Sequence, residues 1–100
     1  MTLVQLRHLV CLADLGSYVQ ASKALFLTQP ALTRSIQSLE EEMGGRLFDR
    51  LGRRIELTAL GREVLYRARQ LVSDAEALKQ TGKVMHAGLI GVMRMGLSSA

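Results

Sequence analysis

The only proline in the chain, Pro30, limits the possible folds more than any other residue. Proline lacks the amide that a helix interior needs and clashes with the preceding turn, so it is tolerated only in the first turn of a helix. A run with helical periodicity follows it. Gly44 and Gly45 then supply a stop, because glycine adopts the left-handed conformation of a helix end without steric cost. The pattern therefore predicts a helix from about Gln29 to Met43.

This predicted helix has two different faces. One face repeats apolar residues at spacings of four, three and four, which form a narrow stripe at about 100° per residue. The stripe consists of Leu32, Ile36, Leu39 and Met43. The opposite face consists of Pro30, Thr33, Arg34, Gln37 and Glu41. We expect the apolar stripe to lie in the core and the opposite face to lie in solvent.

Two shorter helices are predicted before this one. Apolar residues at helical spacing predict a helix that begins near Leu3, and Gly16 ends it. Ser17 and Gln20 have the spacing of a capping box, which predicts a second helix over 18–25. Because aromatic residues make up only 4% of the chain, we expect these helices to share an aliphatic core.

The chain changes character after the third helix. Short apolar pieces flank Gly52 within 46–57, which predicts a small β-hairpin. Thr58 can cap a fourth helix over 59–81, whose apolar residues have the spacing of a coiled coil. These residues are Val64, Ala68, Leu71, Ala75 and Leu78. The start of this stripe could pack within the chain, but a helix of about 20 residues spans about 30 Å. Its far part is therefore expected to pair with a second copy of the chain.

The last segment, 82–100, places glycines among apolar residues, with Lys83 and Arg94 as its only charges. This pattern predicts a hinge followed by a strand over 89–97. No predicted sheet could receive such a strand, so we expect the chain to be the front end of a longer protein.

The positive charge is concentrated in one segment. The formal net charge is +4 with an isoelectric point near 9.8. The stretch 46–69 contains seven arginines against three acidic residues, which accounts for the whole excess. The hairpin arginines are Arg46, Arg50, Arg53 and Arg54. A run of charges can be only a solvated face, but a basic hairpin beside an exposed helix also suits the phosphate backbone of nucleic acid.

Other kinds of site find little support in the residues. Cys11 is the only cysteine, so no disulfide can form within the chain and a reducing cytoplasm fits best. Arg7, His8 and Asp14 interrupt the apolar start, which predicts neither a signal peptide nor a membrane span. His8 and His86 have no ligand partners at metal-site spacing. No nucleophile pattern or phosphate loop stands out. We therefore expect no enzyme, metal or other cofactor in this segment.

Three short helices, a basic hairpin and a long helix are the order of a winged helix-turn-helix domain followed by a dimerisation helix. In that arrangement the third helix enters the major groove, where Gln29, Thr33 and Arg34 could bond base edges or phosphates. The helix dipole favours phosphates at this end, whereas acidic residues 40–42 disfavour them at the other. The alternative is an ordinary capped helix with a solvated Arg34.

An ordered series of motifs runs through 16–61, "GSYVQASKALFLTQPALTRSIQSLEEEMGGRLFDRLGRRIELTALG". It contains alanines on the second helix, a Thr-Gln-Pro-Ala start to the third, then Leu-Glu-Glu, Leu-Phe and a closing Leu-Thr…Gly. In these motifs the chain resembles the amino-terminal DNA-binding domain of LysR-type transcriptional regulators of bacteria. Ser22 stands where that family commonly has alanine, and Gly45 stands where it usually has a side chain. Neither departure touches the expected DNA-reading surface.

The resemblance implies a mainly α fold. It implies a winged helix-turn-helix of three helices and a two-stranded wing over 1–58, a dimerisation linker helix over 59–81, and a hinge with the first strand of an effector-binding domain over 82–100. The residues expected at the DNA are Gln29, Pro30, Thr33, Arg34 and, on the same face, Gln37. The wing residues are Arg50, Arg53 and Arg54. The expected dimer contacts are Val64, Ala68, Leu71, Ala75 and Leu78.

The function expected from these features is that of a bacterial, cytoplasmic transcription regulator. It would bind double-stranded DNA as a homodimer and would not contact a membrane. The resemblance further implies tetramers and a small-molecule effector in the full-length protein, with no cofactor in this segment. An alternative of a different class is a helical protein-interaction module whose basic hairpin meets an acidic protein surface.

Overall fold

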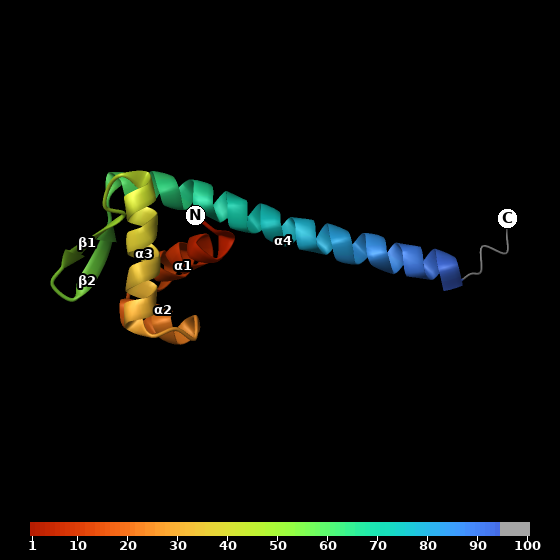
Figure 1. Ribbon diagram of the computed structural model, residues 1–100, viewed down its shortest axis with the longest axis horizontal. Coiled ribbons are helices and arrows are strands. Elements are labelled where there is room, and N and C mark those ends of the chain that lie inside the picture. The colour runs from red at the N-terminus through yellow and green to blue at the C-terminus, as the bar shows by residue number, and fades with distance from the viewer. Residues whose placement is uncertain (95–100) are drawn as a thin grey trace.

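The computed structural model describes residues 1–94, which are mainly helical (Figure 1). Its elements run in the order α1 (Leu3–Leu15), α2 (Tyr18–Ala24), α3 (Gln29–Met43), β1 (Phe48–Leu51), β2 (Arg54–Leu57) and α4 (Ala59–Arg94). The two strands pair antiparallel as a hairpin. This order confirms the predicted winged helix-turn-helix followed by a long linker helix.

Local signals set both ends of α3 at the predicted residues. The Thr28 hydroxyl accepts a hydrogen bond from the Ala31 amide at 3.2 Å, and Pro30 occupies the first turn, where its missing N–H has no helical partner in any case. At the other end Gly44 takes φ 76°, and its amide donates to the Glu40 carbonyl. The helix therefore begins and ends by backbone chemistry that the sequence specifies.

The two shorter helices begin with side-chain caps. The Ser17 hydroxyl accepts from the Gln20 amide at 3.2 Å, so α2 begins where predicted. Thr2 and Gln5 form a reciprocal capping box at the start of α1, which the sequence analysis missed. Gly16, at φ 68°, ends α1 as expected.

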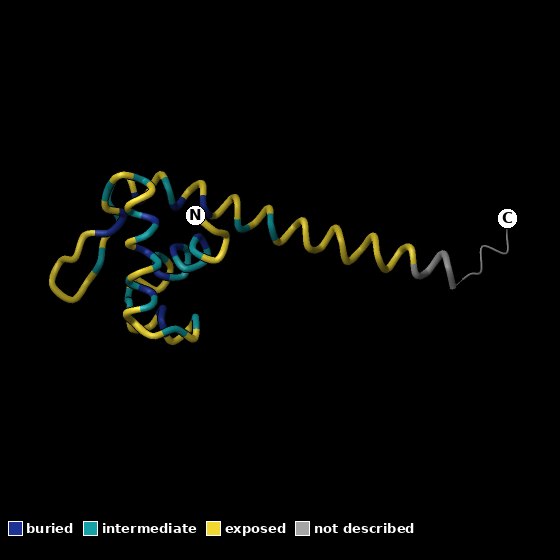
Figure 2. Tube along the Cα trace, viewed as in Figure 1, coloured by how far each residue is buried: buried dark blue, intermediate teal, exposed yellow. Residues whose placement is uncertain are grey.

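An aliphatic core lies where the first three helices meet the hairpin and the start of α4. From α3 it receives Leu32, Ile36 and Leu39, as predicted, while Met43, the fourth residue of the predicted stripe, is only partly buried against it. The other buried apolar members are Leu6, Leu9, Leu12, Ala21, Leu47, Phe48, Leu65 and Ala68. In Figure 2 the buried residues gather in the head of the molecule and in the first turns of α4, while the outer turns of α4 are exposed.

Two ion pairs join α1 to α4. Arg7 pairs with Glu76 and Asp14 pairs with Arg69, each with an N···O distance of 2.5 Å. The earlier residue of α1 meets the later residue of α4, so the two helices run antiparallel. All four side chains are substantially exposed, so water and salt screen both pairs and they add little to stability. The apolar contacts beneath them therefore hold the helices together more than the charges do.

The base of the hairpin is fastened to α4 by a group of contacts that we call the Thr58 clasp. The Thr58 amide donates to the Leu47 carbonyl at 3.0 Å. The Thr58 hydroxyl donates to the Arg46 carbonyl at 2.6 Å and accepts from the Gly61 amide at 2.9 Å. A Cβ atom on Gly61 would overlap the Leu47 carbonyl, so only glycine fits where the two backbones cross.

Gly61→Ala is expected to destabilise the fold, because the added methyl group meets backbone that cannot rotate away. Overpacking of this kind costs about 1–3 kcal/mol, to be measured as the free energy of unfolding in urea. Gly88→Ala is the matched control, since a Cβ there meets nothing within 4 Å. It should leave stability unchanged or raise it by less than about 1 kcal/mol. Equal stabilities for the two variants would contradict the close approach at Gly61.

The prediction of a hinge from residue 82 and a strand from 89 is wrong for the described part of the chain. Residues 82–94 continue α4, which is 36 residues long, or about 54 Å. Each glycine costs about 1 kcal/mol in a helix interior, but the alanine, leucine and methionine around Gly82 and Gly88 favour helix. The sheet in residues 1–94 is the hairpin at the other end of the molecule, so no edge competes for this segment. Residues 95–97 of the predicted strand lie outside the described residues.

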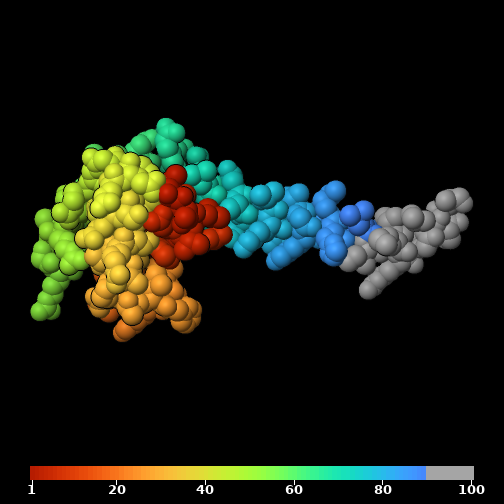
Figure 3. Space-filling model, viewed as in Figure 1, coloured from red at the N-terminus to blue at the C-terminus, as the bar shows by residue number. Residues whose placement is uncertain are grey.

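The long helix leaves the head as an arm (Figure 3). Apolar side chains along it are largely exposed, including Leu78, Val84, Met85 and Leu89. The head and the base of α4 therefore form the packed unit, and the arm carries apolar surface away from it.

Candidate nucleic-acid interface

The polar face of α3 lies on the outside of the molecule, as predicted. It consists of exposed Gln29, Pro30, Arg34 and Gln37 and of partly exposed Thr33. Leu32 and Ile36 on the other side of the same turns are buried. Because the buried side chains fix the rotation of the helix, the polar face is presented in one orientation.

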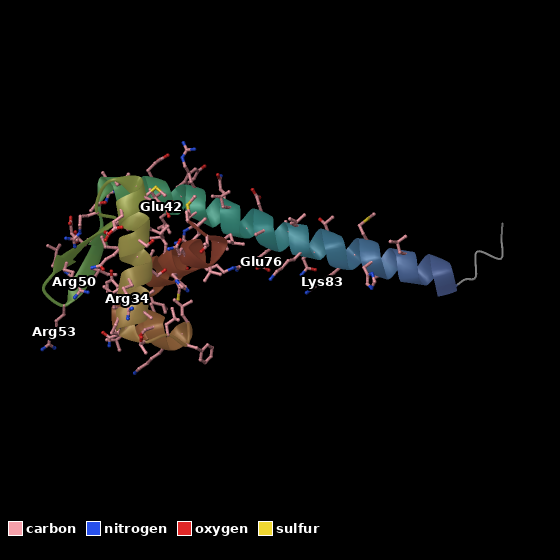
Figure 4. The ribbon with its side chains drawn as sticks, viewed as in Figure 1. Arg34, Glu42, Arg50, Arg53, Glu76 and Lys83 are labelled. Carbon is pink, nitrogen blue, oxygen red and sulfur yellow. The ribbon has the colours of Figure 1, made fainter. Side chains whose placement is uncertain are left out.

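The hairpin, which we call the wing, presents its arginines to solvent. Leu51 pairs with Arg54 across a tight turn in which Gly52 takes φ 64°. Arg50, Arg53 and Arg54 are all exposed, and Figure 4 shows Arg53 reaching out from the tip of the wing. The prediction that these arginines lie on a two-stranded hairpin is confirmed.

Two open clefts join the wing to the helices. The larger one, about 560 Å³, is lined by Thr33 and Gln37 of α3 and by Arg50 of the wing. The smaller one, about 310 Å³, is lined by Gln29 together with the wing arginines. These wing arginines are Arg50, Arg53 and Arg54. The structure therefore brings three of the predicted helix residues and the predicted wing arginines, which come from separate motifs, to the same two clefts. Pro30 and Arg34 line neither cleft.

The basic groups on this surface are not neutralised by neighbours. Among the ion pairs within the described residues, none includes Arg34 or the three wing arginines. Arg46 differs, because it precedes β1 and its Nε lies 3.8 Å from the Glu40 carboxylate. Glu40 also accepts the Leu47 amide at 2.7 Å, so it closes the loop before the wing. Figure 4 shows Arg34 and Glu42 towards opposite ends of α3, which leaves the positive end of the helix beside the wing.

The turn between α2 and α3 contains a residue that sequence reasoning missed. Phe26 takes φ 57°, in the left-handed region that disfavours side chains, and its side chain is 95% exposed. Two consecutive backbone amides stabilise the turn. The Phe26 amide donates to the Lys23 carbonyl, and the Leu27 amide donates to the Ser22 carbonyl. The turn is therefore set by backbone bonds, and the only signal for it in the sequence is its shortness.

The two departures from the family pattern have simple structural accounts. Ser22 is buried, and its hydroxyl donates to the Val19 carbonyl at 2.9 Å, so no polar group is left unsatisfied. A Cβ on Gly45 would lie 3.0 Å from the Leu60 side chain, so glycine allows Leu60 to approach closely. Neither position contributes to the polar face of α3.

One side-chain hydrogen bond joins α3 to α1. His8 Nδ1 and Ser35 Oγ lie 2.7 Å apart, and Ser35 follows Arg34 in the sequence. Burial lowers the pKa of His8 below its ordinary value of 6.5. The neutral ring is therefore the form that the folded protein favours.

The pKa of His8 leads to a pH-dependent stability. Because the unfolded chain binds this proton more tightly than the folded chain, stability should fall as the pH drops below about 6.5. His8→Gln should lose less stability than the wild type between about pH 8 and pH 5, measured by urea unfolding. His86→Gln, at an exposed position of α4, should keep the wild-type dependence. Identical pH profiles for His8→Gln and the wild type would contradict this assignment.

The apolar stripe of α4 divides into an inner and an outer part. Ala68 is only 1% exposed and belongs to the core of its own chain, so its predicted role in a dimer contact is wrong. Val64 is partly buried against the same core. Leu71 and Leu78 are 49% and 72% exposed, so the outer part remains available. Asp14 and Arg7 of α1 pair with Arg69 and Glu76, so Leu71 lies within the stretch of α4 that α1 contacts, and Leu78 lies beyond these pairs.

Two further observations complete the description of the surface. No helix within residues 1–94 is both long and apolar enough to cross a lipid bilayer. In the same part of the chain, no three side chains of His, Cys, Asp or Glu gather as a metal site would require.

Comparison with protein families gives one clear match. The model described as "Bacterial regulatory helix-turn-helix protein, lysR family" matches residues 3–62. Among curated relatives, the chain is 46% identical over 92 residues to the SDS degradation transcriptional activation protein of Pseudomonas sp. (strain ATCC 19151). The match covers 92% of this chain and 30% of that protein. The chain thus spans less than a third of the length of this relative.

Comparison with solved structures gives the same fold bound to DNA. The DNA-binding domain of CbnR in its DNA complex matches with a TM-score of 0.79 and 34% identity, over 86% of this chain and 99% of that one. The DNA-binding domain of BenM in complex with the catB site 1 DNA matches with a TM-score of 0.83 and 33% identity. That match covers 88% of this chain and 95% of the BenM chain.

Proposed function

The chain belongs to the lysR family of bacterial regulatory helix-turn-helix proteins, and on that premise we propose that it is the part of a transcription regulator that reads double-stranded DNA. The observation that carries the proposal is the smaller cleft, where Gln29 of α3 lines the same space as wing arginines. A helix start beside a basic hairpin suits a major groove and the adjoining backbone. The activity is binding, and no catalysis is involved.

Each residue of the α3 face has a distinct role in this proposal. The Gln29 amide can bond an adenine edge, and Arg34 can pair with guanine or a phosphate. Thr33 can bond either a base or a phosphate from its partly exposed position. Pro30 fixes the first turn against the duplex, and Gln37 extends the face by one turn. The unneutralised positive end of α3 supports this placement.

The wing supplies contacts that do not depend on sequence. Arg53 lies in the wing turn and Arg54 begins β2, and both are exposed and free to reach phosphates or the minor groove. Arg50 lies nearer to the helices, where it lines both clefts. The wing therefore adds affinity and fixes the orientation of α3 in the groove.

The exposed part of α4 suits a second copy of the chain. Leu71, Ala75 and Leu78 keep coiled-coil spacing; Leu71 and Leu78 are exposed, and Ala75 is partly buried. A pair of such helices would set two heads on a two-fold site. In the longer protein we propose a small-molecule effector domain after α4, tetramers, and action in the cytoplasm.

Base reading and backbone binding should separate by mutation. Gln29→Ala should weaken binding to a duplex selected from a random pool by about 1–3 kcal/mol, with little effect on unrelated duplex. Arg53→Ala should weaken binding to both duplexes alike and reduce the salt slope by about one. Gln80→Ala, on the exposed arm of α4, is the control for a lost glutamine and should bind as wild type.

The same measurement decides between DNA and an acidic protein surface. The wing arginines would favour either partner by charge, but only DNA reading requires discrimination between base sequences. If a dimer neutralises about 6 to 10 phosphates, affinity should fall roughly 10³- to 10⁵-fold between about 50 and 200 mM salt. Equal affinity of the wild type for every duplex would overturn the proposed function.

The dimer contact has its own test. Leu71→Asp places a charge on the exposed stripe and should give monomers by light scattering, because burying an unpaired carboxylate is costly. Tyr66→Asp is the control, since Tyr66 is exposed on the opposite side of α4 and should leave the mass of the dimer unchanged. A dimeric Leu71→Asp variant would show that the stripe has another purpose.

A further inference from the structure

The outer half of the wing has little packing of its own. Phe48 is buried at the root of β1, but the next three residues of that strand are exposed. On β2 only Ile55 and Leu57 are partly buried. A short two-stranded hairpin is marginally stable by itself. A fixed position of the outer wing relative to α3 therefore requires a contact beyond the Thr58 clasp.

One contact spans the gap between the wing and the helices. The guanidinium carbon of Arg50 lies 4.8 Å from the centroid of the Tyr18 ring, within the range of a cation–π interaction. Tyr18 is the first residue of α2, directly after the Ser17 cap, so its backbone is fixed by the helix start. Arg50 lies midway along β1 and beyond the buried root. The contact therefore reaches the part of the wing that the core does not.

Tyr18 also stands between the two clefts. Together with Arg50 it lines the larger cleft beside Thr33 and the smaller cleft beside Gln29. The ring is partly buried, and this burial raises the pKa of its hydroxyl, while the nearby Arg50 charge opposes part of the rise. The side chain is thus a neutral aromatic wall against which a guanidinium can lie flat.

We infer that Tyr18 is a positioning residue for DNA binding, whose ring holds Arg50 and thereby sets the wing at a fixed place relative to the α3 face. A guanidinium carries five N–H donors, so Arg50 can contact the ring and still donate to a phosphate in the cleft. The inference rests on the proposed DNA-binding function. It means that an aromatic side chain of α2 aligns the α3 face with the wing, although the three elements are separate in the sequence.

The order of the wing can be tested without DNA. Trypsin cleaves after arginine, and the exposed wing offers Arg53 and Arg54. Tyr18→Leu should speed cleavage in the wing by about tenfold, because the wing opens more often. Tyr18→Phe keeps the ring and should be cleaved at the wild-type rate. Tyr66→Leu removes the other tyrosine, on α4, and should also match the wild type. Equal cleavage of Tyr18→Leu and Tyr18→Phe would overturn the inference.

The link to binding is tested by a double-mutant cycle on the selected duplex. Tyr18→Leu should weaken binding about tenfold, and Arg50→Ala should weaken it at least as much. In the Arg50→Ala background, Tyr18→Leu should not weaken binding further. Tyr18→Phe as a single substitution should bind as tightly as the wild type. Independent, multiplying losses would show that Tyr18 acts without Arg50 and would overturn the inference.

Two controls keep the outcome clear. Tyr18→Met fills a similar volume without a ring and replaces Tyr18→Leu in both experiments if thermal unfolding shows that the leucine variant is unfolded. A wild type that binds every duplex equally would reject the proposed function, while the trypsin result would still decide the position of the wing. A selective wild type with an unaffected Tyr18→Leu variant would reject the inference alone.

Discussion

The structure depends on one constraint, which is the two-sided character of α3. Leu32, Ile36 and Leu39 are buried, so each turn of the helix is anchored in the core and the helix cannot rotate without exposing large apolar side chains. The polar residues between them are consequently held outwards at fixed positions. Pro30 and Gly44 set the two ends of the helix. A surface that recognises a partner through a few side chains needs this rigidity, because small displacements break hydrogen-bond geometry.

The wing and the linker helix are arranged around that fixed helix. Glu40, in the last turn of α3, accepts a hydrogen bond from the Leu47 amide. The Thr58 clasp joins the residues before β1 to the residue after β2. Gly61 lets α4 cross the base of the wing at backbone distance. One small region therefore connects the α3 face, the basic hairpin and the arm. The Arg50 contact with Tyr18 adds a further attachment, between α2 and the exposed part of β1.

Much of this arrangement could be predicted from the sequence because it is encoded locally. The bounds of α3, the turn at Gly52 and the exposed arginines follow from proline, glycine and the spacing of apolar residues. Contacts between distant segments could not be predicted in this way. The burial of Ala68 depends on how the head packs against α4, and the ring beside Arg50 depends on how α2 meets the wing. α4 continues past Gly82 because the surrounding residues favour helix and the described residues offer no strand to pair with this segment. Apolar periodicity alone contains neither piece of information.

The central claim is that the first turn of α3 and the wing form one DNA-binding surface. Hydrogen exchange of the protein, compared with and without its selected duplex, tests this claim most directly. The account predicts that DNA slows exchange of the Gln29 and Ala31 amides, on either side of Pro30, and of the amides in 50–54, while 79–89 on the arm exchange as before. Protection on the arm, with 29–31 and 50–54 unaffected, would contradict the account.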